Sequence, residues 1–179
     1  MLTESEFDRV LKWQPYREDW PVDRNKSDDN IESYYGELIR AFLRNDLFDC
    51  YFSQNGEMGN YLEFYCYPKG SKTYEGPAII VCVSLCCPIA CYGPSKLWLK
   101  EKSTGLGGLF DVEDMYKITD IRLVPIEKEI LSILNKNNLM LLEKEFAARK
   151  LPPAFLLNNH YENLNEGILN LQGMFQLID

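Results

Sequence analysis

A chain of 179 residues is long enough to bury a core of its own as one domain, so it needs neither disulfides nor a structural metal to fold. Hydrophobic residues make up 46% of the chain and aromatic residues 13%, which excludes an intrinsically disordered polypeptide. The 27 acidic and 19 basic residues leave a net charge of −8, which disfavours nucleic acid as a partner and favours a basic protein, although the same acidity also serves solubility.

The first segment predicts a short helix followed by an irregular polar region. Thr3 and Glu6 have the spacing of a capping box, and Pro15 ends the helical pattern. Beyond the helix, Trp13 and Trp20 stand among charged residues, where they either cover the edge of the core or form an exposed contact surface. The amino-terminal residues lack the basic and apolar regions of a signal peptide, so we expect a cytoplasmic protein.

The most regular helical pattern covers residues 30–45. Its apolar side chains recur at spacings of three and four, which places them on one face of a helix, with charged residues opposite. The pattern predicts a helix that packs its apolar face on the core. The residues of that face are Ile31, Tyr34, Tyr35, Leu38, Ile39, Phe42 and Leu43.

From residue 47 the hydrophobic period changes to two, which indicates strands. Residues 47–54 and 61–67 alternate on either side of the turn signal Asn55-Gly56 and predict a β-hairpin. The uncharged run 78–92, broken by Pro88, predicts two more strands that are buried on both faces. Short turns imply mainly antiparallel pairing. One face of the hairpin carries a row of aromatic residues that we expect to pack under a helix, Tyr61, Tyr65 and Tyr67.

The second half of the chain predicts a glycine-rich loop, three helices, of which one is a short helix at residues 143–150, and a short strand. The loop at residues 103–108 lacks the Lys-Ser/Thr ending of a phosphate-binding loop. A helix at 126–137 begins behind Pro125, residues 139–142 form a strand, and residues 164–178 carry a last helical pattern.

Together these elements predict a single α+β domain over residues 1–179. A central, mainly antiparallel sheet is flanked by the helices at 30–45, at 126–137 and at the carboxyl terminus. No apolar run approaches the ~20 residues needed to cross a bilayer, so we expect no membrane partner.

Six cysteines and one histidine are the residues suited to metal binding or nucleophilic catalysis. Cys82, Cys86, Cys87 and Cys91 lie in the apolar run, where buried thiolates are costly, so core packing is favoured over a metal site. In an extended chain, Cys82 and Cys86 face away from Cys87 and Cys91 unless the proline break resets the register. His160 lies in a polar loop, and nothing brings a cysteine to it. We expect no catalytic residue, no metal and no cofactor.

The amino-terminal third favours a protein partner. Residues 1–37 contain 10 acids and 5 bases, interleaved with aromatic side chains of the kind that anchor protein interfaces. An acidic surface with aromatic residues suits a protein that masks a basic partner, although a solvated face over a core helix has the same pattern. The candidate partner-binding residues are Trp13, Asp19, Trp20, Asp23 and Asp28.

The order of the elements carries a resemblance. An early tryptophan-bearing helix and a long amphipathic helix precede an antiparallel sheet with the buried run 79–91, and a strand at 139–142 leads to a short helix, Leu151-Pro152-Pro153 and finally Met174-Phe175. This layout resembles the small cytoplasmic immunity proteins of bacterial polymorphic toxin systems, although the tryptophan-bearing tail of some of them is absent. The resemblance implies a non-enzymatic protein that binds and blocks one cognate toxin.

Two alternatives remain open. The chain could be an enzyme or small-molecule-binding protein with a pocket at the sheet edge near residues 105–108, and with His160 or Cys91 as the reactive group. It could also be a homo-oligomer whose aromatic residues are buried at a symmetric interface.

Overall fold

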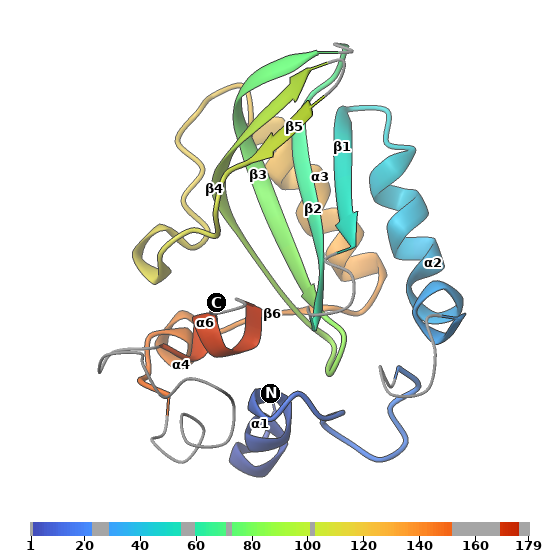
Figure 1. Ribbon diagram of the computed structural model, residues 1–179, viewed down its shortest axis with the longest axis vertical. Helices are drawn as coiled ribbons and strands as arrows, with labels where there is room; N and C mark the ends of the chain where they lie inside the picture. The colour runs from blue at the N-terminus through green and yellow to red at the C-terminus, as the bar shows by residue number, and fades with distance from the viewer. Residues whose placement is uncertain are drawn as a thin grey trace.

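The computed structural model describes residues 2–22, 29–54, 60–70, 73–100, 103–151 and 169–175. Five strands form an antiparallel sheet in chain order, and a short sixth strand runs parallel to the fourth (Figure 1). The predicted α+β class, with a mainly antiparallel sheet flanked by helices, is confirmed. The strands are β1 (Phe48–Gln54), β2 (Tyr61–Pro68), β3 (Tyr74–Ser84), β4 (Ile89–Lys100), β5 (Ser103–Leu106) and β6 (Met140–Leu141).

The helices agree with the predicted positions. The helices predicted at 30–45 and 126–137 correspond to α2 and α3, and α6 lies inside the predicted range 164–178, most of which is outside the described residues. Within the described residues, no helix combines the length and apolar character needed to cross a lipid bilayer. The helices are α1 (Glu4–Leu11), α2 (Asp29–Leu43), the 3-10 helix η1 (Val112–Asp114), α3 (Val124–Lys136), α4 (Lys144–Ala147) and α6 (Asn170–Phe175).

The start of α1 is a capping box, as predicted. The Glu6 amide donates to Thr3 Oγ1 at 3.3 Å, and the Thr3 amide donates to Glu6 Oε2 at 2.8 Å. Each side chain thus satisfies a backbone N–H group that the helix itself leaves without a partner.

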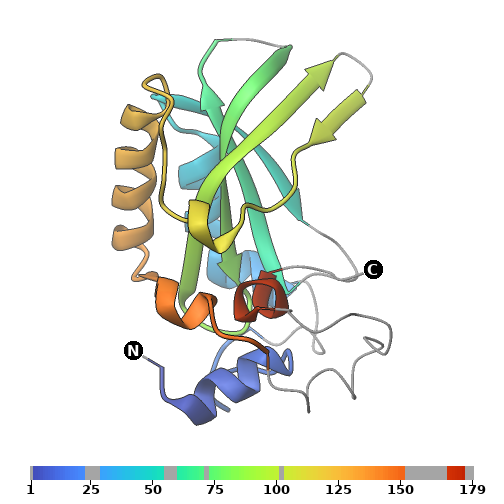
Figure 2. The same ribbon diagram turned by 90° about the vertical axis from the view of Figure 1, so that its left-hand side faces the viewer.

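The sheet is covered on both faces. Helices α2 and α3 pack on one face, and α1, α4 and α6 pack on the other face at one end of the strands (Figures 1 and 2). Phe64 of β2 stacks on Phe42 of α2, with ring centroids 4.3 Å apart, and Tyr61 of the same strand meets Phe175 of α6 edge-on at 5.8 Å. The expected packing of the hairpin tyrosines under a helix is therefore confirmed at Tyr61.

The apolar face of α2 is narrower than its sequence predicts. Leu38 and Phe42 are fully buried, but the side chains of Tyr34 and Leu43 are 45% and 48% exposed. The prediction that all seven apolar residues share one buried face is wrong for these two, because the sheet covers only the central stripe of the helix. Tyr34 is consequently available at the surface.

The turn between β3 and β4 resets the register of the cysteines. Cys82 lies directly opposite Cys91 across the two strands, and both belong to the core beneath α1, α4 and α6, together with Cys86 and Cys87. The predicted core packing of the cysteines is confirmed, since these four and Cys66 are buried.

The glycine-rich segment is a strand rather than a loop, which corrects the prediction. Residues 103–106 form β5 and pair with the polar end of β4, whose backbone would otherwise be an open edge. The Gly107 amide donates to the Lys96 carbonyl at 2.8 Å, and a Cβ on Gly107 would lie 2.8 Å from Lys96 N. Glycine is therefore needed here for close backbone approach and not for cradling a ligand.

Candidate partner-binding surface

Three aromatic residues are fixed on the β3–β4 turn by consecutive backbone carbonyls. The Tyr35 hydroxyl donates to the Ser84 carbonyl at 2.8 Å, the Trp20 indole N–H donates to the Leu85 carbonyl at 2.8 Å, and the Tyr16 amide donates to the Cys86 carbonyl at 2.9 Å. These bonds satisfy carbonyls at the end of β3 and in the turn that follows it. They also attach the irregular segment after α1 to the end of the sheet.

The rings of these residues continue into a row that includes Tyr34. Centroid distances are 5.1 Å from Tyr16 to Trp20, 5.0 Å from Trp20 to Tyr34 and 4.9 Å from Tyr34 to Tyr35, each with edge-on geometry. Pairs of this kind contribute about 0.5–1.5 kcal/mol each beyond the burial of their area. We call Tyr16, Trp20, Tyr34 and Tyr35 the aromatic row.

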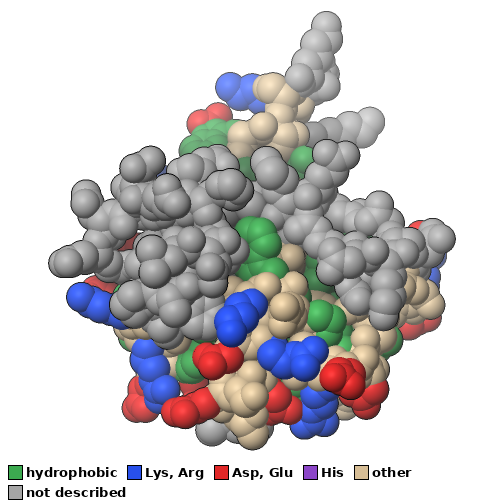
Figure 3. Space-filling view, turned by 60° about the horizontal axis from the view of Figure 1, so that its bottom comes forward, with side chains coloured by type: hydrophobic (Ala, Val, Ile, Leu, Met, Phe, Trp, Pro, Cys, Tyr) green, Lys and Arg blue, Asp and Glu red, His purple; other side chains and the backbone are tan. Residues whose placement is uncertain are grey.

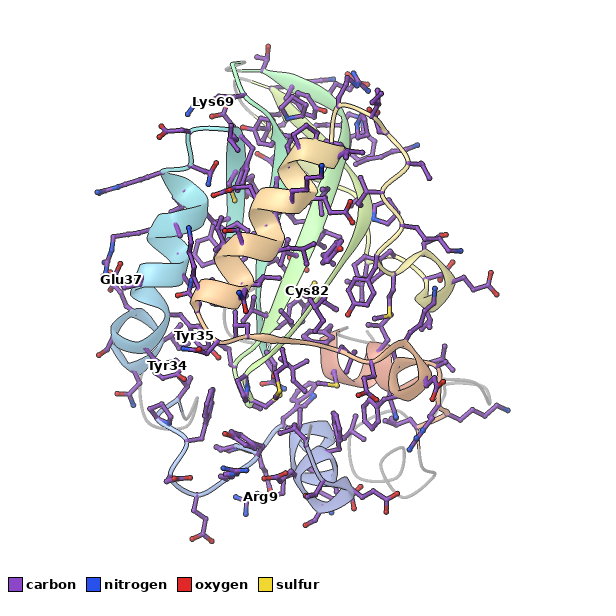
Figure 4. The ribbon with its side chains drawn as sticks, turned by 180° about the vertical axis from the view of Figure 1, so that it is seen from behind. Arg9, Tyr34, Tyr35, Glu37, Lys69 and Cys82 are labelled. Atoms are coloured by element: carbon purple, nitrogen blue, oxygen red, sulfur yellow. The ribbon has the colours of Figure 1, made fainter. Side chains whose placement is uncertain are left out.

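The four residues of the aromatic row differ in burial, and Tyr34 is the most exposed of them. Tyr35 is 3% exposed and Trp20 is half-buried, whereas Tyr34 is 45% exposed (Figure 4 shows Tyr34 and Tyr35 at the amino-terminal half of α2). Desolvation raises the pKa of Tyr35 well above its ordinary value and also raises the pKa of Tyr34. Both hydroxyls are therefore neutral at physiological pH; that of Tyr35 donates to the Ser84 carbonyl.

An ion pair connects the aromatic row to α1. Arg17 lies over the Tyr16 ring, 4.9 Å from its centroid, and its Nε is 2.7 Å from Glu6 Oε1. The Thr3 amide and Arg17 stabilise the Glu6 carboxylate, in that order, and lower its pKa to about 2. Glu6 thus caps α1 and also holds the segment that carries Trp20.

The charges around the aromatic row are mixed. Glu18, Asp19 and Glu32 are exposed, and the exposed Glu37 is paired with Arg40 at 2.7 Å. Figure 3 brings the lower end of Figure 1 forward. Where the residues are described, acidic and basic side chains are interspersed on this surface, with hydrophobic side chains between them. The excess of acids in this third of the sequence is therefore partly offset locally by bases.

The structure places three of the five predicted partner-binding residues. Trp20 belongs to the aromatic row and Asp19 is exposed next to it, while Trp13 is half-buried in the turn after α1, with a φ of 61°. Asp23 and Asp28 lie outside the described residues.

Tyr34 is not among the five predicted partner-binding residues, although it is one of the interleaved aromatic residues of the amino-terminal third. The helical periodicity placed it on the apolar face of α2, yet its ring is the most exposed of the aromatic row. The signal that could have found it is its position at the boundary of the apolar stripe formed by Ile31, Tyr35, Leu38 and Phe42. The bonds to the three carbonyls have no sequence signature, because they join residues 49 to 70 positions apart.

A buried carboxyl group lies elsewhere on the sheet. Glu63 of β2 is 7% exposed and is the one charged side chain that the described part of the chain buries. It stands opposite Ser53 on one side and Cys82 on the other. Desolvation raises the pKa of Glu63, against a smaller lowering by a hydrogen bond with Tyr61. No basic group pairs with Glu63 among the ion pairs of the described residues.

The described residues place two features of the enzyme alternative. His160 is outside the described residues, Cys91 is fully buried, and residues 103–106 are paired in the sheet. The described residues contain no group of three or more metal-ligating side chains.

A shallow groove lies away from the predicted sheet-edge pocket. It has a volume of about 510 Å³ and separates the outer face of α3 from β6. Leucine side chains form most of its wall, and one cation lies at it. The lining residues are Lys128, Leu131, Ser132, Leu134, Asn135, Leu139 and Leu141.

Comparison with protein-family models, with curated proteins and with solved structures finds no match for this chain. A functional proposal therefore depends on the residues and their geometry.

Proposed function

We propose that this chain is a cytoplasmic, non-enzymatic inhibitor that binds and occludes a basic, toxin-like protein through the aromatic row and the carboxylates beside it. The observation that carries the proposal is the half-exposed ring of Tyr34, supported from behind by Trp20 and Tyr35. The resemblance of the layout to immunity proteins points to the same class of partner.

A supported aromatic ring is an efficient interface anchor. Tyrosine and tryptophan are enriched among the few residues that dominate binding energy, and they do so best where the ring is already held in place. Trp20 and Tyr35 each hydrogen bond to a backbone carbonyl of the β3–β4 turn, so Tyr34 rests on rings that are fixed to the sheet. Little side-chain entropy remains to be lost when a partner covers it.

The exposed carboxylates supply the electrostatic part of the mechanism. Glu18 and Asp19 directly precede Trp20 in the chain, and these two carboxylates and Glu32 of α2 are exposed and have the sign needed to attract a basic partner. Charges at the rim of an interface act mainly on the association rate, and salt screens them. In this mechanism Tyr34 supplies affinity, and the carboxylates supply steering.

The test measures binding to the product of the adjacent gene, captured by pull-down and then titrated at low and high salt. Tyr34→Ala should weaken binding at least about tenfold, as expected for an interface anchor. Asp19→Lys should slow association at low salt and have little effect at high salt. Leu43→Ala is the matched control, because Leu43 is an exposed apolar residue at the other end of the same helix.

Equal affinity for the wild type and Tyr34→Ala, with a folded variant, would contradict the use of the aromatic row. If Leu43→Ala weakened binding as much as Tyr34→Ala, the interface would lie elsewhere on α2. Self-association through Tyr34, measured by light scattering, would favour the homo-oligomer instead.

The α3–β6 groove favours a second candidate function, the binding of a small amphipathic ligand. Its volume of about 510 Å³ is in the range of ligand sites, and Lys128 could pair with an anionic group. A metabolite panel screened by thermal shift would test this. A metabolite that raises the melting temperature of the wild type and of Leu43→Glu, but not of Leu131→Glu, would support a ligand site in the groove. If no metabolite raised the melting temperature, the ligand site would be contradicted.

A further inference from the structure

The sheet contains two pairs of cysteines that lie directly opposite each other on neighbouring strands. Cys50 of β1 faces Cys66 of β2, and Cys82 of β3 faces Cys91 of β4. The first pair lies on the face covered by α2 and α3, and the second lies on the opposite face. Directly opposed residues of antiparallel strands have Cα atoms about 4.5–5.5 Å apart, which is within the range that a disulfide can bridge.

The environment of the two pairs is also alike. Burial raises the pKa of the Cys66 and Cys82 thiols, and the neighbouring thiols of Cys50 and Cys91 raise it further. The two pairs therefore have the same strand register and the same mutual influence of one thiol on the other.

Accessibility separates the two pairs. Cys50 is half-buried on the edge strand β1, whereas Cys66, Cys82 and Cys91 are completely buried. A water-soluble oxidant can reach a pair through Cys50 without unfolding the protein, but it has no such access to the second pair. The buried pair thus serves as an internal control for the exposed one.

We propose that Cys50 and Cys66 form an oxidation site at which a peroxide produces a reversible disulfide between β1 and β2, while Cys82 and Cys91 stay reduced. This inference is independent of the proposed inhibitor function.

The chemistry takes place in two balanced steps. The Cys50 thiolate attacks one peroxide oxygen, the O–O bond breaks, and Cys50 becomes a sulfenic acid as hydroxide leaves. The Cys66 sulfur then attacks the Cys50 sulfur, the S–O bond breaks, and the hydroxyl leaves as water with the Cys66 proton. The proton that Cys50 lost on ionisation joins the hydroxide, so two thiols lose two electrons and one hydrogen peroxide is reduced to two waters.

The order of attack follows from the environment of each sulfur. Desolvation raises the pKa of Cys66 well above that of a free thiol, which keeps this residue protonated. Cys50 is the partner in contact with solvent, so it meets the oxidant first and Cys66 resolves the sulfenic acid.

The experiment treats the reduced, folded protein with hydrogen peroxide, blocks the remaining thiols, and locates the disulfides by peptide mass spectrometry. The Cys50–Cys66 bond should form at least about tenfold faster than any modification of Cys82 or Cys91, and dithiothreitol should reverse it. Cys66→Ala should leave Cys50 as a sulfenic acid that dimedone traps. Cys50→Ser should abolish reaction of Cys66, and it changes a half-exposed residue, so the fold should be retained.

Three results would overturn the proposal. One is oxidation of Cys82 and Cys91 at the same rate as Cys50 in the folded protein. Another is a disulfide that links Cys50 of two chains instead of Cys50 to Cys66. The third is a Cys50 that does not react in the folded protein at a peroxide concentration that oxidises both pairs in urea. This result would show that the peroxide does not reach Cys50 in the folded protein.

Discussion

Replacing Gly93 with alanine should destabilise the protein by about 1–2 kcal/mol, because the Phe110 ring occupies the place of the added methyl group. A Cβ on Gly93 would lie 2.7 Å from Phe110 Cδ2 and nearer still to Cγ and Cδ1. Phe110 is buried and packs across the middle of β4, so its ring must shift within the core or leave it.

The magnitude follows from two opposing effects. Overpacking a core costs about 1–3 kcal/mol, and expelling a buried phenylalanine costs about 1.5–3 kcal/mol. Against this, replacing glycine by alanine restricts the unfolded chain and stabilises by about 0.4–1 kcal/mol. The free energy of unfolding, measured by urea denaturation, should fall accordingly for Gly93→Ala.

Two variants isolate the cause. Gly108→Ala is the matched control, because a Cβ there meets nothing within 4 Å, so only the unfolded-chain effect remains and the free energy of unfolding should rise by about 0.4–1 kcal/mol. In a Phe110→Ala background the cost of Gly93→Ala should largely disappear, which a double-mutant cycle detects. A Gly93→Ala protein as stable as the wild type would refute the packing of Phe110 on β4, and so would additive effects in the cycle.

Three further predictions concern the buried carboxyl group and the aromatic row. Because burial raises the pKa of Glu63, ionisation of this carboxyl group destabilises the fold above the ordinary carboxyl pKa. Glu63→Gln should therefore raise the midpoint of urea denaturation at pH 7 and not at pH 4. Equal increases at both pH values would contradict this. Because the pKa of Glu6 is lowered, its stabilising contribution is present above the ordinary carboxyl pKa and is lost as the pH falls towards about 2. NMR titration of its side-chain carboxyl carbon should show this low pKa. A midpoint above pH 4 would exclude the pairing with Thr3 and Arg17. Trp20→Phe keeps a ring in the row but removes the donor to the Leu85 carbonyl, so it should cost about 1 kcal/mol in urea denaturation, and an unchanged midpoint would show that this bond contributes nothing.

Part of the candidate site could be predicted from the sequence. The composition of the amino-terminal third indicated an aromatic surface with acidic residues, and the structure places Trp20 and Asp19 together at the end of the sheet. The composition could not show that the Trp20 indole donates a hydrogen bond inside the protein, nor that Tyr34 is the exposed ring. Both facts depend on which neighbours lie within a few ångströms: the Leu85 carbonyl for the Trp20 indole, and the Trp20 ring beside Tyr34.

The elements themselves were determined by local sequence. The capping box of Thr3 and Glu6, the periodicity of α2 and the alternation in β1 and β2 act between residues a few positions apart, and the structure confirms each of them. What only the tertiary structure decided is where these elements meet: β5 in place of a glycine-rich loop, the pairing of Cys82 with Cys91 across the turn, and the exposure of Tyr34 at the margin of α2. The physical reason is that strand partners and burial are set by contacts between distant segments, which the hydrophobic period of any one segment does not specify.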